Sequence, residues 1–131
     1  MSRIDIHELV KQWDSVVAVD KVSFTVPEGS LTVLLGPSGC GKSTILRLIA
    51  GLEKRTSGSI FISGNEVTHM DPSKRGVSMV FQSYALFPHL NVRENILFGL
   101  KVRGISPGDQ RSRLKEAERR KMAWMDDIRG A

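Results

Sequence analysis

The sequence Gly36-Pro37-Ser38-Gly39-Cys40-Gly41-Lys42-Ser43 fits the pattern Gly-x4-Gly-Lys-Ser/Thr, which is typical of loops that bind phosphate. The apolar run 31–35 (LTVLL) precedes this loop and predicts a buried strand. Residues 44–50 (TILRLIA) follow it and predict a helix, with Gly51 as its C-cap. Strand, glycine-rich loop and helix in this order predict a nucleotide-binding site.

The residue types of the loop suit a polyphosphate. Glycines let the backbone approach the ligand, and the unpaired N–H groups at the start of the helix favour an anion. Lys42 is expected to contact the β- and γ-phosphates and to act in catalysis, and the Ser43 hydroxyl is expected to bind Mg²⁺. The alternative is a glycine-rich turn that matches by chance. The predicted nucleotide-binding residues of this stretch are Gly36, Pro37, Ser38, Gly39, Cys40, Gly41, Lys42, Ser43 and Thr44.

Length and composition limit the classes of protein to which the chain can belong. A length of 131 residues suffices for one small domain or a piece of a larger one. No apolar run approaches the length of a membrane span, and the N-terminal residues are too polar for a signal peptide. The single cysteine excludes an internal disulfide, and the three histidines lie far apart with no metal-ligand spacing.

The net charge of +5 is concentrated near the C-terminus, where residues 101–131 hold nine basic and five acidic side chains. Glu116 and Glu118 are interleaved with the basic residues, which favours a solvated helix face. A nucleic-acid site is the alternative, but no aromatic stacking residues or known nucleic-acid motif accompany the cluster. We therefore expect no nucleic-acid partner.

Strand patterns flank the loop on both sides. Short alternating apolar segments between residues 4 and 26 predict a mostly antiparallel β layer, followed by a turn at 27–29. Residues 59–62 predict another strand, closed by a turn at 64–65, and residues 76–81 predict a buried strand.

Helix signals follow in the second half of the chain. Asp71 before a proline predicts a short helical turn. Asn91 and Glu94 predict a capping box for a helix that ends near Val102. A last helix is expected over about 107–125, although its apolar stripe does not continue cleanly.

Three segments carry a resemblance to a known family. These are residues 36–44, residues 49–53 (IAGLE) and residues 75–89 (RGVSMVFQSYALFPH). Through them the chain resembles the ATP-binding subunit of ATP-binding cassette (ABC) transporters, most of all the subunits that drive bacterial uptake of maltose and glycerol-3-phosphate. The resemblance runs from about residue 3 to about residue 118. It implies an α/β fold, a P-loop NTPase-like nucleotide-binding domain with an antiparallel β layer, incomplete at its C-terminal side. Residues 1–118 would be the N-terminal part of that domain, and residues 119–131 a divergent tail.

The resemblance also assigns roles to residues outside the loop. Trp13 matches the aromatic residue that stacks on adenine, against the alternative of a surface tryptophan at a strand edge. Gln82 matches the catalytic glutamine that contacts Mg²⁺ and the attacking water, against the alternative of a polar loop residue. Residues 84–90 match the surface that docks on the membrane subunits, although Phe87, Pro88 and Leu90 could equally be core. ATP and Mg²⁺ are the implied cofactors.

Other parts of the family pattern have no match in the sequence. We find neither the Leu-Ser-Gly-Gly-Gln signature nor the apolar segment ending in Asp-Glu, whose glutamate polarises the attacking water. Residues 122–127 (MAWMDD) mimic the Asp-Glu segment, but we reject the match because no signature precedes it and the run is not strand-like. We therefore expect a truncated or frame-shifted form of such a subunit that has marginal stability or aggregates.

The predicted function is that of the ATP-binding component of an ABC-type solute importer, with a sugar as the expected solute. The resemblance implies three kinds of partner. These are transmembrane permease subunits, a second copy of the ATP-binding subunit and, indirectly, an extracytoplasmic solute-binding protein. It also implies a cytoplasmic location on the inner face of the cell membrane. The alternative is a nucleotide-binding fragment or gene remnant without ATPase activity. Because the catalytic glutamate has no match, we expect the isolated chain to show no measurable ATPase activity.

Overall fold

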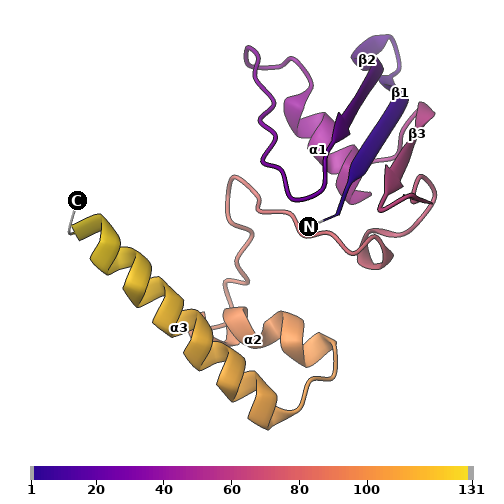
Figure 1. The fold of residues 1–131 in the computed structure, drawn as a ribbon. Helices are drawn as coiled ribbons and strands as arrows, with labels where there is room; N and C mark the ends of the chain where they lie inside the picture. The colour runs from indigo at the N-terminus through magenta and orange to yellow at the C-terminus, as the bar shows by residue number, and fades with distance from the viewer. Residues whose placement is uncertain (1, 130–131) are drawn as a thin grey trace. The chain divides into compact units, whose positions relative to one another are not determined.

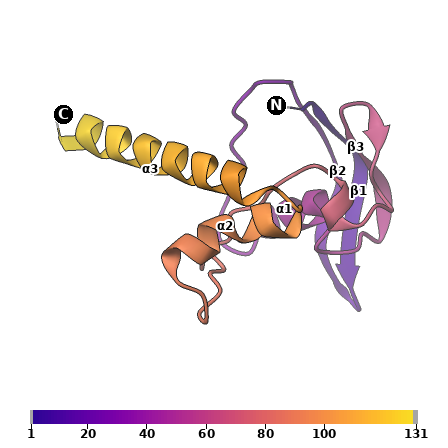
Figure 2. The same ribbon diagram turned by 90° about the horizontal axis from the view of Figure 1, so that it is seen from below.

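The computed structural model describes residues 2–129, and the chain forms two compact units, Met1–Met79 and Val80–Ala131. The first unit is a β-sheet with one helix packed on it, and the second consists of two helices with the turns that precede them (Figures 1 and 2). The α/β class predicted from the sequence is confirmed. None of the helices in the described residues is long and apolar enough to cross a membrane.

The sheet has four strands, β1 (Ile4–Trp13), β2 (Val16–Val26), β3 (Ser57–Ile62) and β4 (Asn65–Glu66). Their order is β2-β1-β3-β4 and every pairing is antiparallel, as the alternating patterns predict. β1 and β2 form a hairpin in which Trp13 pairs with Val16, and Asp14 takes a positive φ of 48° in the turn between them.

The core lies between this sheet and helix α1 (Lys42–Ala50). Ile45 and Leu48 lie one turn apart on the same face of α1, so both point at the sheet. Fully burying a side chain of this kind contributes about 1.5–3 kcal/mol. The buried core cluster consists of Ile6, Leu9, Val19, Ile45, Leu48, Ile60, Ile62 and Val67.

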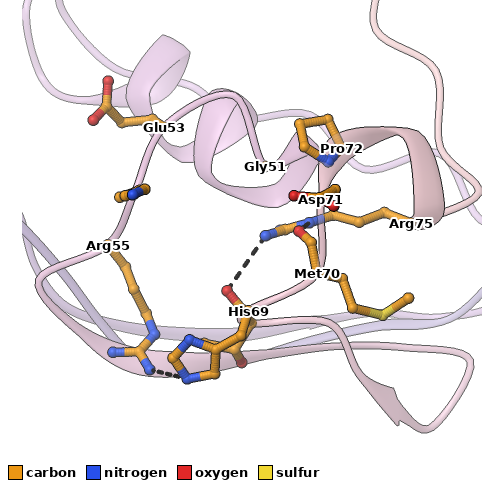
Figure 3. Close-up of a pocket in the computed structure, with 10 residues that line it drawn as sticks. Gly51, Glu53, Arg55, His69, Met70, Asp71, Pro72 and Arg75 are labelled. Carbon is orange, nitrogen blue, oxygen red and sulfur yellow. Dashed lines mark hydrogen bonds between the residues drawn. The ribbon is translucent and has the colours of Figure 1, made fainter.

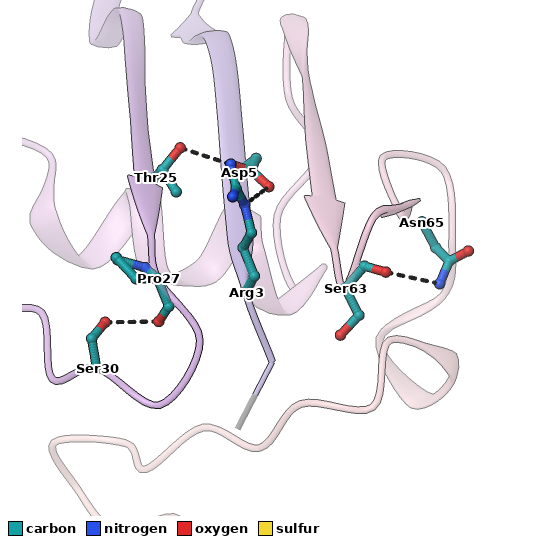
Figure 4. Close-up of polar contacts among 7 residues, drawn as sticks. All are labelled: Arg3, Asp5, Thr25, Pro27, Ser30, Ser63 and Asn65. Atoms are coloured by element: carbon teal, nitrogen blue, oxygen red, sulfur yellow. Dashed lines mark hydrogen bonds and ion pairs between the residues drawn. The ribbon is translucent and has the colours of Figure 1, made fainter.

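Polar contacts define the ends of the strands (Figure 4). Asp5 accepts hydrogen bonds from the Arg3 guanidinium at 2.8 Å and from the Thr25 hydroxyl at 2.7 Å, which joins β1 to β2. The Ser30 hydroxyl donates to the Pro27 carbonyl at 2.8 Å, which closes the turn predicted at 27–29. The turn predicted at 64–65 lies one residue earlier, at Ser63 and Gly64, which have φ values of 52° and 78°, and Asn65 begins β4.

Two predicted strands are wrong. Residues 31–35 form no strand, and Leu31 and Leu35 are 91% and 87% exposed. Residues 76–81 form no strand either, and Val80 is 85% exposed, although Val77 packs against the core. A strand needs a neighbour for its backbone hydrogen bonds, and within the described residues no segment pairs with either run. Both runs therefore remain outside the sheet, with Leu34 and Val77 packed against the core and other apolar side chains exposed.

The second unit contains α2 (Val92–Val102) and α3 (Pro107–Arg129), which pack against each other. The predicted capping box is confirmed, because Glu94 N–H donates to Asn91 Oδ1 at 2.9 Å and Asn91 N–H donates to Glu94 Oε2 at 3.0 Å. α3 runs four residues beyond the predicted end at 125. It includes residues 122–127, which supports the rejection of that run as a strand.

Candidate functional site

The predicted phosphate loop leads directly into α1. Lys42 is the first residue of the helix and Gly41 is its N-cap, in the left-handed region at a φ of 89°. A Cβ on Gly41 would lie 2.4 Å from the Ala18 carbonyl oxygen of β2, so only glycine fits this contact. Gly51 ends α1 at a φ of 79°, as its predicted C-cap role requires. The loop and the helix are therefore as predicted, while the strand expected before them is not formed.

The Lys42 side chain folds back over the loop. Its Nζ donates to the carbonyl oxygens of Gly36 and Pro37, both at 2.7 Å, and lies 3.3 Å from the Cys40 Sγ. The ammonium is thus held inside the curve of the loop by its own backbone. A cation in this position is placed to meet an anion that enters the loop.

The start of α1 has donors to offer such an anion. Within the described residues no side chain caps this helix, and its first turn holds no acidic residue. The first N–H groups of a helix lack intrahelical partners and carry the positive end of the helix dipole. The Ser43 side chain is exposed at the same end of the helix, where a metal bound to a phosphate could reach its hydroxyl.

The opposite end of α1 is closed by Arg75, which the sequence reasoning missed. This residue follows the short 3₁₀ helix η1 (Pro72–Lys74) and is 7% exposed. Its guanidinium donates to the carbonyls of Leu48 at 2.9 Å and Ile49 at 3.0 Å, and also to Met70 and Thr68. Burial lowers the pKa of Arg75 from its ordinary value. A buried cation is favourable here because it meets the negative end of the helix dipole.

A pocket of about 430 Å³ lies at this C-terminal end of α1 and not at the phosphate loop (Figure 3). Arg55 and His69 are in contact in its wall, with Arg55 Nη2 and His69 Nε2 separated by 3.1 Å. Gly51 and Arg75 also line the pocket. The guanidinium atoms of Arg75 already meet backbone carbonyls, so the pocket is part of the packing around the helix end.

Trp13 lies at the end of β1 and is 44% exposed. Lys11, two residues earlier on the same strand, holds its Nζ 4.9 Å from the centroid of the Trp13 ring. The same Nζ donates to Glu53 Oε1 and to the Lys54 carbonyl, both at 2.7 Å. The bond from Lys11 lowers the pKa of the Glu53 carboxyl from its ordinary value. The sequence reasoning did not single out Lys11, although its i, i+2 spacing from Trp13 puts both on one face of the strand.

Gln82 belongs to the second unit, where it is exposed in the turn at residues 82–85. Tyr84 and Ala85 in this turn have positive φ values of 61° and 49°. The approach of Gln82 to Ser43 and to a shared metal remains a prediction.

The turn that follows is held to α2 by one side chain, Asn95. Its Oδ1 accepts from Phe87 N–H at 2.9 Å, and its Nδ2 donates to the carbonyls of Leu90 at 2.9 Å and Asn91 at 3.0 Å. The Phe87 and Phe98 rings lie 4.4 Å apart. An apolar pocket of about 270 Å³ opens here, lined by Leu86, Phe87, Pro88, Leu90, Val92, Asn95 and Ile96.

Comparison with known proteins agrees with this description. The ABC transporter family model matches residues 19–129. The chain is 49% identical over 114 residues to the Fe(3+) ions import ATP-binding protein FbpC of Escherichia coli O157:H7, which covers 87% of the chain and 33% of that protein. It is 47% identical over 120 residues to the sn-glycerol-3-phosphate import ATP-binding protein UgpC of Salmonella typhimurium strain LT2, which covers 91% of the chain and 34% of that protein. The chain thus spans about a third of the length of these relatives.

Solved structures give the same result. A dimeric ATP-binding cassette in a post-hydrolysis state, bound to ADP and phosphate, superposes with a TM-score of 0.76 at 28% identity, over 86% of this chain and 54% of the cassette. A nucleotide-free cassette superposes with a TM-score of 0.68 at 30% identity, over 84% and 45%. The chain therefore belongs to the ABC transporter family, and its fold is that of a part of an ATP-binding cassette.

Proposed function

We propose that the chain is an ATP-binding component of an ABC-type solute importer, and that it binds MgATP at the loop formed by residues 36–44. The observation that carries this proposal is the position of the Lys42 ammonium, held inside the loop by the Gly36 and Pro37 carbonyls. The relatives named as import ATP-binding proteins support the importer class.

The residues present fit a magnesium–nucleotide complex. The uncapped start of α1 offers N–H donors to phosphate oxygens, and Lys42 can exchange its two carbonyl contacts for phosphate contacts. Ser43 would supply a hydroxyl ligand to Mg²⁺, and Gln82 an amide oxygen. When bound, Mg²⁺ would neutralise charge on the phosphates. Trp13 would stack on the adenine, for which its half-exposed ring is available.

The solute, the partners and the location of the subunit are proposed from its family. The two relatives are named for different solutes, Fe(3+) and glycerol-3-phosphate, so they support import without selecting one solute class. We propose a sugar as the solute, on the resemblance of the sequence to sugar-uptake subunits. The proposed partners are transmembrane permease subunits, a second copy of the ATP-binding subunit, and indirectly a solute-binding protein. The dimeric cassette that resembles this chain supports the second copy. We propose that the subunit acts in the cytoplasm at the inner face of the membrane, where permease subunits would contact residues 84–90.

Calorimetric titration of the purified chain with MgATP tests nucleotide binding. We expect saturable binding that weakens tenfold or more in Lys42→Ala, since a hydrogen bond to a charged group contributes about 1.5–3 kcal/mol. Lys74→Ala is the matched control, because Lys74 is exposed on η1 and lies outside the loop. Equal affinities in wild type and Lys42→Ala would refute binding at this loop.

A phosphate-release assay distinguishes an ATP-hydrolysing subunit from a fragment that only binds nucleotide. The sequence offers no match to the catalytic glutamate, so we expect MgATP binding without hydrolysis above the Lys42→Ala level. Hydrolysis above that level, abolished by Gln82→Ala, would instead show that the chain is a complete ATPase.

A further inference from the structure

We propose that Lys11 is a positioning residue for the nucleotide base, because its ammonium, anchored by Glu53, fixes the indole of Trp13 in the orientation that stacks on the base. This inference rests on the proposed binding of MgATP. It assigns part of the affinity for the base to an ion pair that touches neither the base nor the phosphates.

The burial of Lys11 shows that its ammonium is held in place. The residue is 8% exposed, which is unusual for lysine, and its Nζ has two short contacts, to Glu53 Oε1 and to the Lys54 carbonyl. Both acceptors lie in the segment that follows the phosphate-loop helix. The third neighbour of the Nζ is the ring of Trp13, with the centroid at 4.9 Å.

The ion pair is not required to attach this segment to the sheet. Thr56 N–H donates to the Val10 carbonyl at 2.8 Å, and Gln12 N–H donates to Thr56 Oγ1 at 2.9 Å. These bonds join the segment to β1 on either side of Lys11. An apolar side chain of the same length could fill the volume of the lysine stem. Beyond its bonds to Glu53 and the Lys54 carbonyl, what the ammonium adds is its contact with the indole.

A cation held against an indole restricts the ring. The negative face of the ring is attracted to the ammonium, and the attraction is larger when both are partly desolvated. Because the anchored Nζ cannot follow the ring, the indole loses rotational freedom before any ligand arrives. Stacking on a base then costs less conformational entropy. The 44% of Trp13 that stays exposed is available to the base.

The pair also lies near the phosphate loop. Lys11 pairs with Val19 across the hairpin, and the neighbouring Ala18 carbonyl faces Gly41 at the start of α1. Trp13 is two residues further along the same strand. The ring and the loop therefore belong to adjoining parts of one unit.

The test is a titration of the full 131-residue chain in a Trp124→Phe background, where Trp13 is the single indole. MgATP and magnesium tripolyphosphate are titrated by calorimetry, and the indole emission of each variant is recorded. The variants are Lys11→Met, Lys11→Arg, Glu53→Gln, Trp13→Ala and the double variant Lys11→Met/Trp13→Ala. Thermal unfolding by circular dichroism shows which of them fold.

We expect Lys11→Met to weaken the binding of MgATP by about 2- to 10-fold, which is the range of a cation–π contact. The affinity for magnesium tripolyphosphate should stay unchanged. Lys11→Arg should restore the affinity, and Glu53→Gln should reproduce part of the loss even if Lys11→Met fails to fold. The indole emission should shift in Lys11→Met. In the Trp13→Ala background the Lys11 substitution should have no further effect.

Two results would overturn the inference in distinguishable ways. If Lys11→Met weakens the binding of MgATP equally with and without Trp13, or weakens the binding of tripolyphosphate as much, the lysine acts on the fold and not on the ring. If the wild type binds neither MgATP nor tripolyphosphate, the proposed function itself fails.

Discussion

Arg75 donates from Nη1 to the carbonyl of Leu48 at 2.9 Å, a contact that joins residues 27 positions apart in the sequence. Leu48 is a fully buried core residue in the last turns of α1. The segment after β4 is thereby attached to the end of the helix that begins at the phosphate loop. The cation adds to the Gly51 cap, because it also donates to the Ile49 carbonyl, one of the last carbonyls of the helix, which lack intrahelical partners.

Removal of this cation should destabilise the first unit. Arg75→Met removes the guanidinium donor from the Ile49 carbonyl and one of two donors from the Leu48 carbonyl, which keeps the Gly51 N–H at 3.1 Å. A buried carbonyl left unpaired costs about 1–3 kcal/mol. We expect the free energy of unfolding in urea to fall accordingly. Lys74→Met is the control one residue away, since Lys74 is exposed and its pair with Asp71 spans 3.9 Å, so it should change stability by less than about 0.5 kcal/mol. Similar losses in both variants would contradict this account of Arg75.

The contact between Gly41 and Ala18 predicts a difference between two glycines of the loop. Gly39 and Gly41 both have positive φ, but a Cβ on Gly39 would meet nothing within 4 Å, whereas one on Gly41 would meet the Ala18 oxygen at 2.4 Å. Gly39→Ala should cost only the backbone strain, about 1–2 kcal/mol. Gly41→Ala should cost more and should also reduce MgATP affinity. Urea unfolding and calorimetry measure both, and equal costs would show that the backbone relaxes around the contact.

The Arg3–Asp5–Thr25 contacts predict a loss of stability in acid. The bonds from Arg3 and then Thr25 lower the pKa of Asp5 to about 2. Its value in the unfolded chain is about 3.9, so the unfolded state binds the proton first as the pH falls. The contribution of Asp5 is therefore complete above about pH 4 and is lost as the pH falls to about 2. Asp5→Asn should remove this part of the pH dependence in denaturant titrations, and Asp71→Asn should leave it in place.

The reactivity of the Cys40 thiol should report whether phosphate occupies the loop. The thiol is exposed and lies 3.3 Å from the Lys42 ammonium, which should move when phosphate enters. We expect MgATP to slow the reaction of Cys40 with maleimide, and Lys42→Ala to abolish this protection. Equal labelling rates with and without MgATP in folded protein would count against nucleotide binding at the loop.

The exposed apolar run at residues 31–35 predicts self-association. Leu31 and Leu35 are almost fully exposed, and neighbouring Val33 is exposed as well. Burial of such side chains between copies is favourable by about 25 cal/mol per Å². In sedimentation velocity, the average molecular mass should rise with protein concentration. The double variant Leu31→Lys/Leu35→Lys should reduce this self-association. Thr32→Lys adds charge at an exposed polar position of the same run and should reduce it less. A soluble monomer with reversible, cooperative thermal unfolding would contradict this prediction.

The sequence predicted local structure better than it predicted pairing between distant segments. The turn that leads into α1, the Gly51 cap and the Asn91–Glu94 capping box depend on residues close together in the chain, and these local structures were confirmed. The strands at 31–35 and 76–81 were inferred from apolar content, but a strand also requires a neighbour, and apolar content alone does not supply one.

The contacts of Arg75 and Lys11 could not be predicted for a related reason. Each joins segments more than 20 residues apart, and a single charged residue in a sequence does not indicate what it will meet. The contact between Lys11 and Trp13, in contrast, could have been predicted, because their i, i+2 spacing on a predicted strand brings both side chains to one face.

The bonds of Asn95 have a mechanical consequence for the second unit. One amide side chain, that of Asn95, connects the backbone of the turn at 87–91 to the first turn of α2. A displacement of that turn cannot occur without moving the helix, unless these bonds break. If a partner pushes on the turn, the force passes through Asn95 to the helix as a whole. We therefore expect residues 87–91 and α2 to move together whenever either of them is displaced.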